Sequence, residues 1–166
     1  MYRVFIATPG DLAREQQTCR DAVSEVNEKT AMPEKTLLVS VGLLVDEQIV
    51  GYRAAVADNI RQCTFFIQVF EDDWGPKNLF RKMFTLATEC RDDASFPMRE
   101  VIVCLKDAPR ETDPDILGFR KELEETAGVR VLHFDKPENL KPQLMEVCSG
   151  WVRAIVAQAG GAAAPS

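Results

Sequence analysis

The sequence has a single histidine, an odd number of cysteines and no long hydrophobic run. A serine or cysteine triad needs a histidine base, but His133 lies inside an apolar run typical of a strand, and no Gly-x-Ser-x-Gly motif is present. No stretch approaches the roughly 20 apolar residues that span a bilayer, and the start of the chain lacks the pattern of a signal peptide. We therefore expect a cytoplasmic protein without a catalytic triad and without a membrane partner.

Reactive or metal-binding cysteine patterns are also missing. The five cysteines are scattered through apolar segments, which indicates reduced thiols packed as small hydrophobic residues. We expect neither a disulfide nor a metal site.

The chain has a net negative charge, because it contains 20 Lys and Arg residues and 26 Asp and Glu residues. Sequence-independent binding of nucleic acid needs a basic protein surface that displaces counterions, so nucleic acid is not an expected partner.

The length and composition suit one folded domain. A chain of 166 residues, 46% apolar and 28% charged, is close to a globular average and long enough for one hydrophobic core. Residues 159–166 are small, uncharged and without periodicity. They predict a flexible tail or linker that follows a single domain over residues 1–158.

Five apolar segments alternate with five amphipathic ones. Uninterrupted apolar runs are typical of strands that are buried on both faces, and strict alternation of strand and helix predicts parallel strands with right-handed crossovers. We expect a doubly wound, flavodoxin-like α/β/α sheet of three layers with strand order 2-1-3-4-5. The expected strands are residues 2–7, 37–45, 64–70, 101–105 and 129–134, and the expected helices are residues 12–28, 52–62, 80–92, 115–126 and 139–158.

In such sheets, ligands bind beyond the carboxyl ends of the strands, where the strand order reverses. The loop Thr8-Pro9-Gly10-Asp11 lies at that point and matches a capping box, in which the threonine oxygen accepts from the N–H of residue 11 and Asp11 reaches back. The same N–H groups could instead bind a phosphate, with Gly10 allowing close approach. Capping alone is favoured, because an aspartate repels phosphate and no Gly-rich fingerprint is present.

The loop after the third strand carries further candidates. Glu71, Asp72 and Asp73 could bind a hard cation together with Asp11, although acidic loop residues are usually only solvated. Trp74 could stack on a nucleobase or hold the loop down by packing, and packing is favoured. Lys106 ends the fourth expected strand. We expect its ammonium group to be solvated rather than to contact a bound anion.

Three segments resemble a TIR-like family that is classified only as a domain of unknown function. They are residues 3–15 (RVFIATPGDLARE), 59–63 (NIRQC) and 69–75 (VFEDDWG), and the resemblance extends over residues 2 to about 158. It implies a TIR or nucleoside-deoxyribosyltransferase type of sheet in a signalling or bacterial defence protein. It also implies protein partners, with a homodimer as one arrangement.

Enzymatic members of that fold cleave the N-glycosidic bond of NAD or a nucleoside with a glutamate early in the third helix. The matching position, four residues after Trp74, is Asn78, which cannot ionise to stabilise an oxocarbenium-like centre. No acidic residue lies between Asp73 and Glu89. Glu89 is about 11 residues further along, roughly 16 Å down a helix, and is expected to face solvent.

The resemblance therefore favours a non-catalytic signalling, scaffold or nucleotide-sensing module, with NAD or another nucleotide as the candidate ligand. The alternative is an NAD or nucleoside N-glycosidase that uses a loop carboxylate from Asp11, Glu71, Asp72 or Asp73. A receiver-like domain is a weaker alternative, because Ala7-Thr8 stands where receivers carry paired acids. The candidate ligand-binding residues are Thr8, Pro9, Gly10, Asp11, Asp73, Trp74, Gly75 and Asn78.

Overall fold

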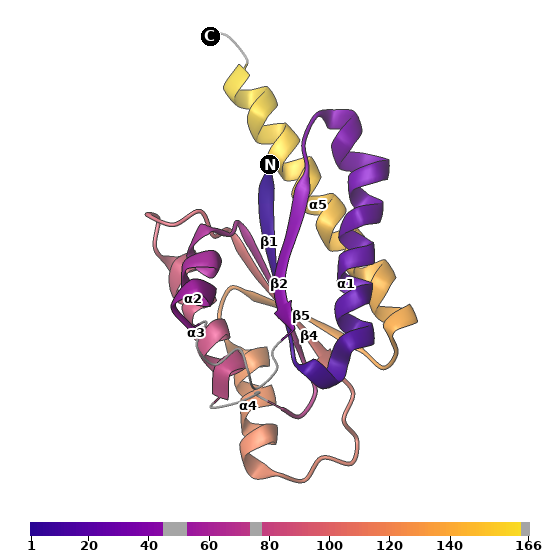
Figure 1. Ribbon diagram of the computed structural model, residues 1–166, viewed down its shortest axis with the longest axis vertical. Helices are drawn as coiled ribbons and strands as arrows, with labels where there is room; N and C mark the ends of the chain where they lie inside the picture. Colours follow the sequence, from indigo (N-terminus) through magenta and orange to yellow (C-terminus); the bar gives the residue numbers. More distant parts are fainter. Residues whose placement is uncertain (45–52, 74–77, 164–166) are drawn as a thin grey trace.

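The computed structural model describes residues 1–44, 53–73 and 78–163. Its core is one sheet of five parallel strands in the order β2-β1-β3-β4-β5, with helices on both faces (Figure 1). The predicted three-layer α/β/α fold and strand order are confirmed. The strands are β1 (Tyr2–Thr8), β2 (Leu38–Leu44), β3 (Phe65–Phe70), β4 (Glu100–Lys106) and β5 (Val129–Phe134).

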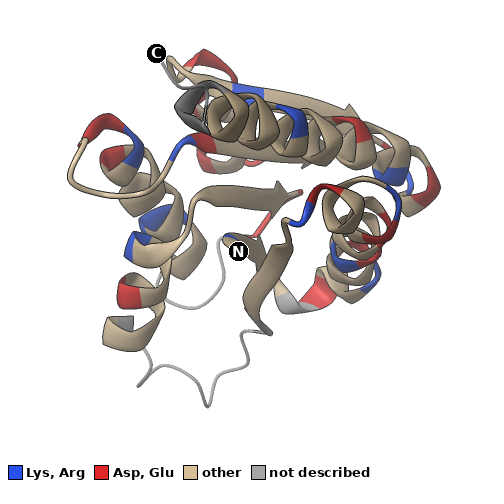
Figure 2. Cartoon of the chain, turned by 90° about the horizontal axis from the view of Figure 1, so that it is seen from above, with Lys and Arg blue, Asp and Glu red and all other residues tan. Residues whose placement is uncertain are grey.

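The helices divide between the two faces of the sheet (Figure 1). Helices α1 (Ala13–Val26) and α5 (Pro137–Ala163) pack together on one face. The opposite face is covered by α2 (Arg53–Gln62), α3 (Leu79–Asp92) and α4 (Pro114–Glu125). Charged residues of both signs lie mainly on the helices and connections, whereas the strands are mostly uncharged (Figure 2).

Strand β3 shows why the sheet has two cores. All six of its residues are buried, and successive side chains point to opposite faces. Phe65, Ile67 and Val69 pack into the core under α1 and α5. Phe66 and Phe70 pack into the core under α2, α3 and α4. The uninterrupted apolar run therefore reflects burial on both sides, as the sequence predicted.

Two helical regions extend further than predicted. After α1, the chain continues as a π-helical turn (Asn27–Ala31) and a 3-10 turn (Met32–Glu34), whereas the sequence predicted an end near residue 28. The second turn accommodates its proline near the first helical position, where no N–H is needed. Helix α5 continues to Ala163 rather than ending at residue 158, although Gly160 and Gly161 have low helix propensity.

Helix α5 is fixed to the amino-terminal edge of the sheet through Trp151. Its ring stacks on Phe65 with ring centroids 4.0 Å apart, and its Nε1 donates to Glu100 Oε2 at 2.6 Å. The other oxygen of Glu100 forms an ion pair with Arg130 at 3.2 Å. The carboxylate at the start of β4 thus has partners on both oxygens.

The five cysteines are free and buried. Burial raises the pKa of Cys63 to about 11 and that of Cys148 to about 12, so both remain protonated thiols at neutral pH. His133 forms a contact of 3.0 Å between its Nε2 and Glu124 Oε1. Among the helices that the structure describes, none is long and apolar enough to cross a bilayer.

Candidate functional site

Three carboxylates meet at the carboxyl-terminal edge of the sheet, where the strand order reverses. Asp11 lies in a 3-10 turn (Gly10–Leu12) that follows β1, and Glu71 and Asp72 directly follow β3. Because β1 and β3 are parallel neighbours, their carboxyl ends lie at the same edge. One oxygen atom from each carboxylate lies within 4.8 Å of the others. We call Asp11, Glu71 and Asp72 the carboxylate trio.

Two members of the trio have raised pKa values. Burial is the main cause for Glu71; the charge of Lys106 opposes it, and Asp72 and Asp11 raise this pKa further. Burial is also the first cause for Asp72, followed by repulsion from Asp11. A carboxyl with a raised pKa holds a proton more readily and can then donate a hydrogen bond. The trio is therefore suited to bind hydroxyl groups and cations rather than anions.

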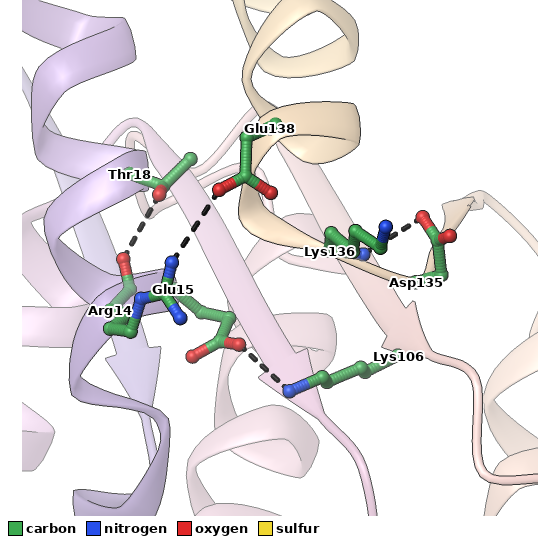
Figure 3. Close-up of polar contacts among 7 residues, drawn as sticks. All are labelled: Arg14, Glu15, Thr18, Lys106, Asp135, Lys136 and Glu138. Carbon is green, nitrogen blue, oxygen red and sulfur yellow. Dashed lines mark hydrogen bonds and ion pairs between the residues drawn. The ribbon is translucent and has the colours of Figure 1, made fainter.

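An ion pair that the sequence did not reveal lies at the same edge (Figure 3). Lys106 ends β4, and its Nζ lies 2.9 Å from Oε1 of Glu15 in the first turn of α1. The side chain of Glu15 is only 5% exposed and that of Lys106 is 24% exposed. This hydrogen bond raises the pKa of Lys106. The expectation of a lysine charge in water is wrong, because the sheet brings it against a nearly buried glutamate.

Helix α4 holds the backbone after β3 in place. Arg120 Nη1 donates to the carbonyl oxygen of Glu71 at 2.9 Å. A guanidinium at a carbonyl forms a charge-assisted hydrogen bond, which is stronger than a neutral one. The position of the trio therefore depends on α4 as well as on β1 and β3.

A cavity of about 320 Å³ adjoins the trio on the side of the β4–α4 connection. Its volume is within the usual range for small-molecule sites. Its charged lining is acidic except for one arginine, which disfavours a phosphate. The residues that line it are Glu71, Asp72, Asp107, Ala108, Pro109, Arg110 and Glu111.

Thr8 does not cap the first helix. It is the last residue of β1 and is fully buried, and its hydroxyl finds no hydrogen-bond partner in the described part of the chain. Pro9 precedes the 3-10 turn, and its carbonyl accepts from the N–H of Leu12 at 3.0 Å. The predicted capping box is wrong, because β1 is one residue longer than predicted. Strand alternation then turns Thr8 toward the core under α1 and α5.

The remaining predicted residues are distributed along the β3–α3 connection. Asp73 follows the trio and is not part of it. Trp74 and Gly75, the candidates for stacking and close approach, lie outside the described residues. Asn78 immediately precedes α3 with a left-handed φ of 57°, a conformation that asparagine adopts more readily than most residues. The exposure predicted for Glu89 is confirmed.

Two buried glutamines were not among the residues predicted from the sequence. Gln68 lies in β3 with no exposed surface, and neither its Oε1 nor its Nε2 has a hydrogen-bond partner among the residues described. Gln16, in the first turn of α1, is 4% exposed and has an unpartnered Nε2. For Gln68 a signal was present, because it is the only polar residue in the run FFIQVF.

A larger cavity, of about 620 Å³, lies between α1 and α5. Ion pairs join the two helices across it, from Arg14 to Glu138 at 3.5 Å (Figure 3) and from Lys141 to Glu25 at 2.8 Å. The hydrogen bond from Lys141 lowers the pKa of Glu25 to about 2. Because these charges already pair with one another, the cavity is less suited to recognise a charged ligand than the carboxyl-terminal edge.

Comparisons with known proteins leave the function open. No protein-family model and no curated protein matches the chain. Among solved structures, the chain is similar to a diflavin flavoprotein A3 from Nostoc sp. with 13% identity, 92% of each chain covered and a TM-score of 0.43. Function must therefore be argued from the site itself.

Proposed function

We propose that this protein is a TIR-like signalling or scaffold module that senses a nucleotide or nucleoside without cleaving it. The observation that carries the proposal is the start of α3. Its first turn holds no acidic residue, and its only carboxylates, Glu89 and Asp92, belong to the opposite end of the helix. In the enzymatic members of the family that the chain resembles, the glutamate that acts on the sugar stands at this first turn.

The carboxyl-terminal edge nevertheless has features of a binding site. The carboxylate trio and the cavity of about 320 Å³, which share Glu71 and Asp72, lie together beyond the end of β3. Ligands of open α/β sheets bind at this place. A ligand held there without reacting would suit a sensor that passes a signal to protein partners, including a second copy of the chain, in the cytoplasm.

The test is to incubate the purified protein with NAD and, separately, with a nucleoside mixture. Chromatography would follow free nicotinamide and free bases, and thermal unfolding would report binding. A thermal shift without base release is the expected result. Base release by the protein would contradict the proposal, and the absence of any shift would leave only the scaffold role.

An N-glycosidase is the second candidate, and the raised pKa of Glu71 and Asp72 favours it. A carboxyl with a raised pKa keeps its proton to a higher pH than an ordinary carboxyl, which suits it to act as a general acid for a leaving base. If this activity exists, Glu71→Gln or Asp72→Asn would abolish base release while leaving the fold intact. The receiver-like alternative lacks such support, because Ala7 and Thr8 at the end of β1 are both buried and neither is acidic.

A further inference from the structure

Strand β2 forms one lateral margin of the sheet, and part of its backbone has no partner. Within the sheet it pairs with β1 alone, and Figure 1 shows α1 and α2 on opposite sides of it. In a parallel ladder, alternate residues of a strand turn their N–H and C=O groups toward one neighbouring strand. In an outermost strand, the groups of the remaining residues therefore point away from the sheet.

Two sets of contacts establish which residues of β2 face outward. The N–H of Tyr2 donates to the carbonyl oxygen of Leu37 at 2.8 Å, and Tyr2 is the register partner of Leu38. The backbone groups of Leu37 and Val39 thus face β1, and those of Leu38 face outward. Asn27 confirms this assignment. Its Nδ2 donates to the carbonyl oxygen of Leu38 at 2.7 Å, and its Oδ1 accepts from the N–H of Leu38 at 2.9 Å.

The same alternation turns the backbone groups of Ser40 and Gly42 outward. Among the described residues, none forms a hydrogen bond with the N–H or C=O of either one. Ser40 is exposed and Gly42 is half-buried, so another chain can reach both. We call these two N–H and two C=O groups the open β2 edge. The fold caps the outward groups of Leu38 with a side chain and leaves those of the next two outward residues free.

The opposite margin of the sheet, β5, is better protected. The carbonyl oxygen of His133 accepts from Gln143 Nε2 at 3.0 Å, and the N–H of Val129 donates to the carbonyl oxygen of Thr126 at 3.3 Å. β5 also carries Arg130, whose side chain is 53% exposed. Capped backbone groups and charged side chains hinder the addition of another strand.

The sequence of β2 lacks these protective features. Residues 37–44 (LLVSVGLL) contain no charged residue and no proline, although charged residues and proline are common means of keeping a strand from adding to a margin. An uncharged strand with free backbone donors and acceptors is a surface on which another extended strand can pair.

A second copy of β2 matches the open β2 edge. When two copies lie antiparallel about a two-fold axis beside Val41, Ser40 of one copy lies opposite Gly42 of the other. Each such pair exchanges two hydrogen bonds between N–H and C=O groups, and the two-fold axis produces the pair twice. All the groups of both open β2 edges are then satisfied.

Two further observations favour a second copy over a strand from another protein. The half-buried Val41 would lie opposite itself across the axis, where a charged side chain would meet an identical charge, and none is present. The side chain of Asn27 already occupies the outward groups of Leu38. A longer foreign strand would meet this cap, whereas self-pairing about Val41 needs only residues 40–42.

We propose that two copies of this chain pair through their open β2 edges, in an antiparallel β2–β2 contact that joins the two sheets into one. The contact uses the same surface on both copies, so it closes at a dimer. This inference goes beyond ligand sensing and does not depend on it, because no member of the carboxylate trio takes part.

The experiment measures the molar mass of the whole chain by light scattering over a range of concentrations. Ser40→Pro removes an outward N–H at a position where the ladder to β1 loses no donor. Ser40→Ala is the matched control, because it removes the hydroxyl and keeps the N–H. Gly42 stays unchanged, because a Cβ there would lie 2.7 Å from the carbonyl oxygen of Ile6. We expect wild type and Ser40→Ala to dimerise alike, and Ser40→Pro to dimerise at least about tenfold more weakly.

Three results would overturn the proposal. The first is a wild-type chain that stays monomeric up to roughly 1 mM. The second is equal dimerisation of folded Ser40→Pro and Ser40→Ala, because the dimer would then use another surface. The third is growth of wild type into assemblies larger than a dimer, which a closed two-fold contact does not allow.

Amide hydrogen exchange of wild type covers the case in which Ser40→Pro does not fold. The N–H groups of Ser40 and Gly42 should exchange quickly in dilute protein and at least about tenfold more slowly at concentrations where the dimer forms. The N–H groups of Val39 and Val41 face β1 and should exchange slowly at both concentrations. Fast exchange of Ser40 and Gly42 in the dimer would overturn the proposal.

Discussion

The two edges of the sheet differ in whether their polar side chains have hydrogen-bond or ion-pair partners. At the amino-terminal edge, both oxygens of Glu100 have partners, one in Trp151 and one in Arg130. Arg3 at the same edge donates to Gln62 Oε1 at 2.8 Å. Glu100 and Arg3 are thus paired with neighbouring side chains, which is the arrangement that stabilises a fold.

The carboxyl-terminal edge has the opposite character. The carboxylate trio brings like charges together, and Thr8, Gln16 and Gln68 have buried polar atoms without partners in the described part of the chain. The remaining atom of this kind, Nη1 of Arg91, belongs to a guanidinium whose other nitrogens contact Asp92. Thr8 and Gln16 thus add unpaired polar atoms to the like charges of the trio at this edge, and this combination indicates a region shaped for binding rather than for stability.

The largest expected effect is at the paired edge. Trp151→Ala removes a stacked, buried ring and the partner of Glu100, and should lower the free energy of unfolding by about 3–5 kcal/mol. Trp151→Phe, which keeps an aromatic ring, should lose much less. Urea unfolding measures both. A loss below about 1 kcal/mol for the alanine variant would contradict the structural role of this edge.

Next is the ion pair at the carboxyl-terminal edge. Lys106→Met leaves the nearly buried Glu15 without its partner and should cost about 2–4 kcal/mol. Lys141→Met is the control, because that pair has nearly the same length but is more exposed, so its loss should cost much less stability. Equal losses in thermal unfolding would show that burial does not distinguish the two pairs.

A smaller gain is expected from Thr8→Val. The substitution keeps the shape of the side chain and removes a buried hydroxyl without a partner among the described residues. We expect a stabilisation of about 1 kcal/mol, measured as a higher midpoint of urea unfolding. A loss of stability would mean that the hydroxyl is satisfied in solution, for example by a water molecule.

The smallest effect concerns Asp72. Its pKa is raised in the folded state, so the folded protein binds this proton more tightly, and the associated stability is lost as the pH rises through the folded pKa. Asp72→Asn should therefore stabilise the protein by roughly 0.5 kcal/mol near neutral pH, after allowance for solvent screening. The gain should disappear below the ordinary pKa of 3.8.

Asp93 provides the control for this pH dependence. Hydrogen bonds from Ser95 lower its pKa, so its contribution to stability is present above the unfolded pKa and is lost as the pH falls. Asp93→Asn should thus change stability in the opposite direction. Thermal unfolding of both variants from pH 3 to pH 7 tests the contrast, and a change of the same sign in both would refute it.

The fold was predictable because its signals are repeated along the chain. Most strands are largely apolar runs followed by an amphipathic helix, and strand β3 shows that burial on both faces produces this pattern. The strand order then places Asp11 near Glu71 and Asp72. Parallel neighbours end at the same edge, so this part of the site follows from topology.

Other parts of the site depend on information that the local sequence does not hold. Thr8 fits both a helix cap and the last position of a strand, and only the length of β1 decides between them. The pairing of Lys106 with Glu15 joins positions 91 residues apart, and it depends on the packing of α1 against the sheet. Gln68 was visible as a polar residue in an apolar run, but its lack of partners is a property of the folded structure.

The most direct test of the central claim is to recover the ligand after binding. Wild-type protein is saturated with NAD or with the nucleoside that binds best, incubated, and denatured, and the released compounds are identified by mass spectrometry. Sensing without cleavage predicts that the ligand is recovered intact in proportion to the protein. Recovery of free base, lost in Glu71→Gln or Asp72→Asn, would contradict it and establish a glycosidase.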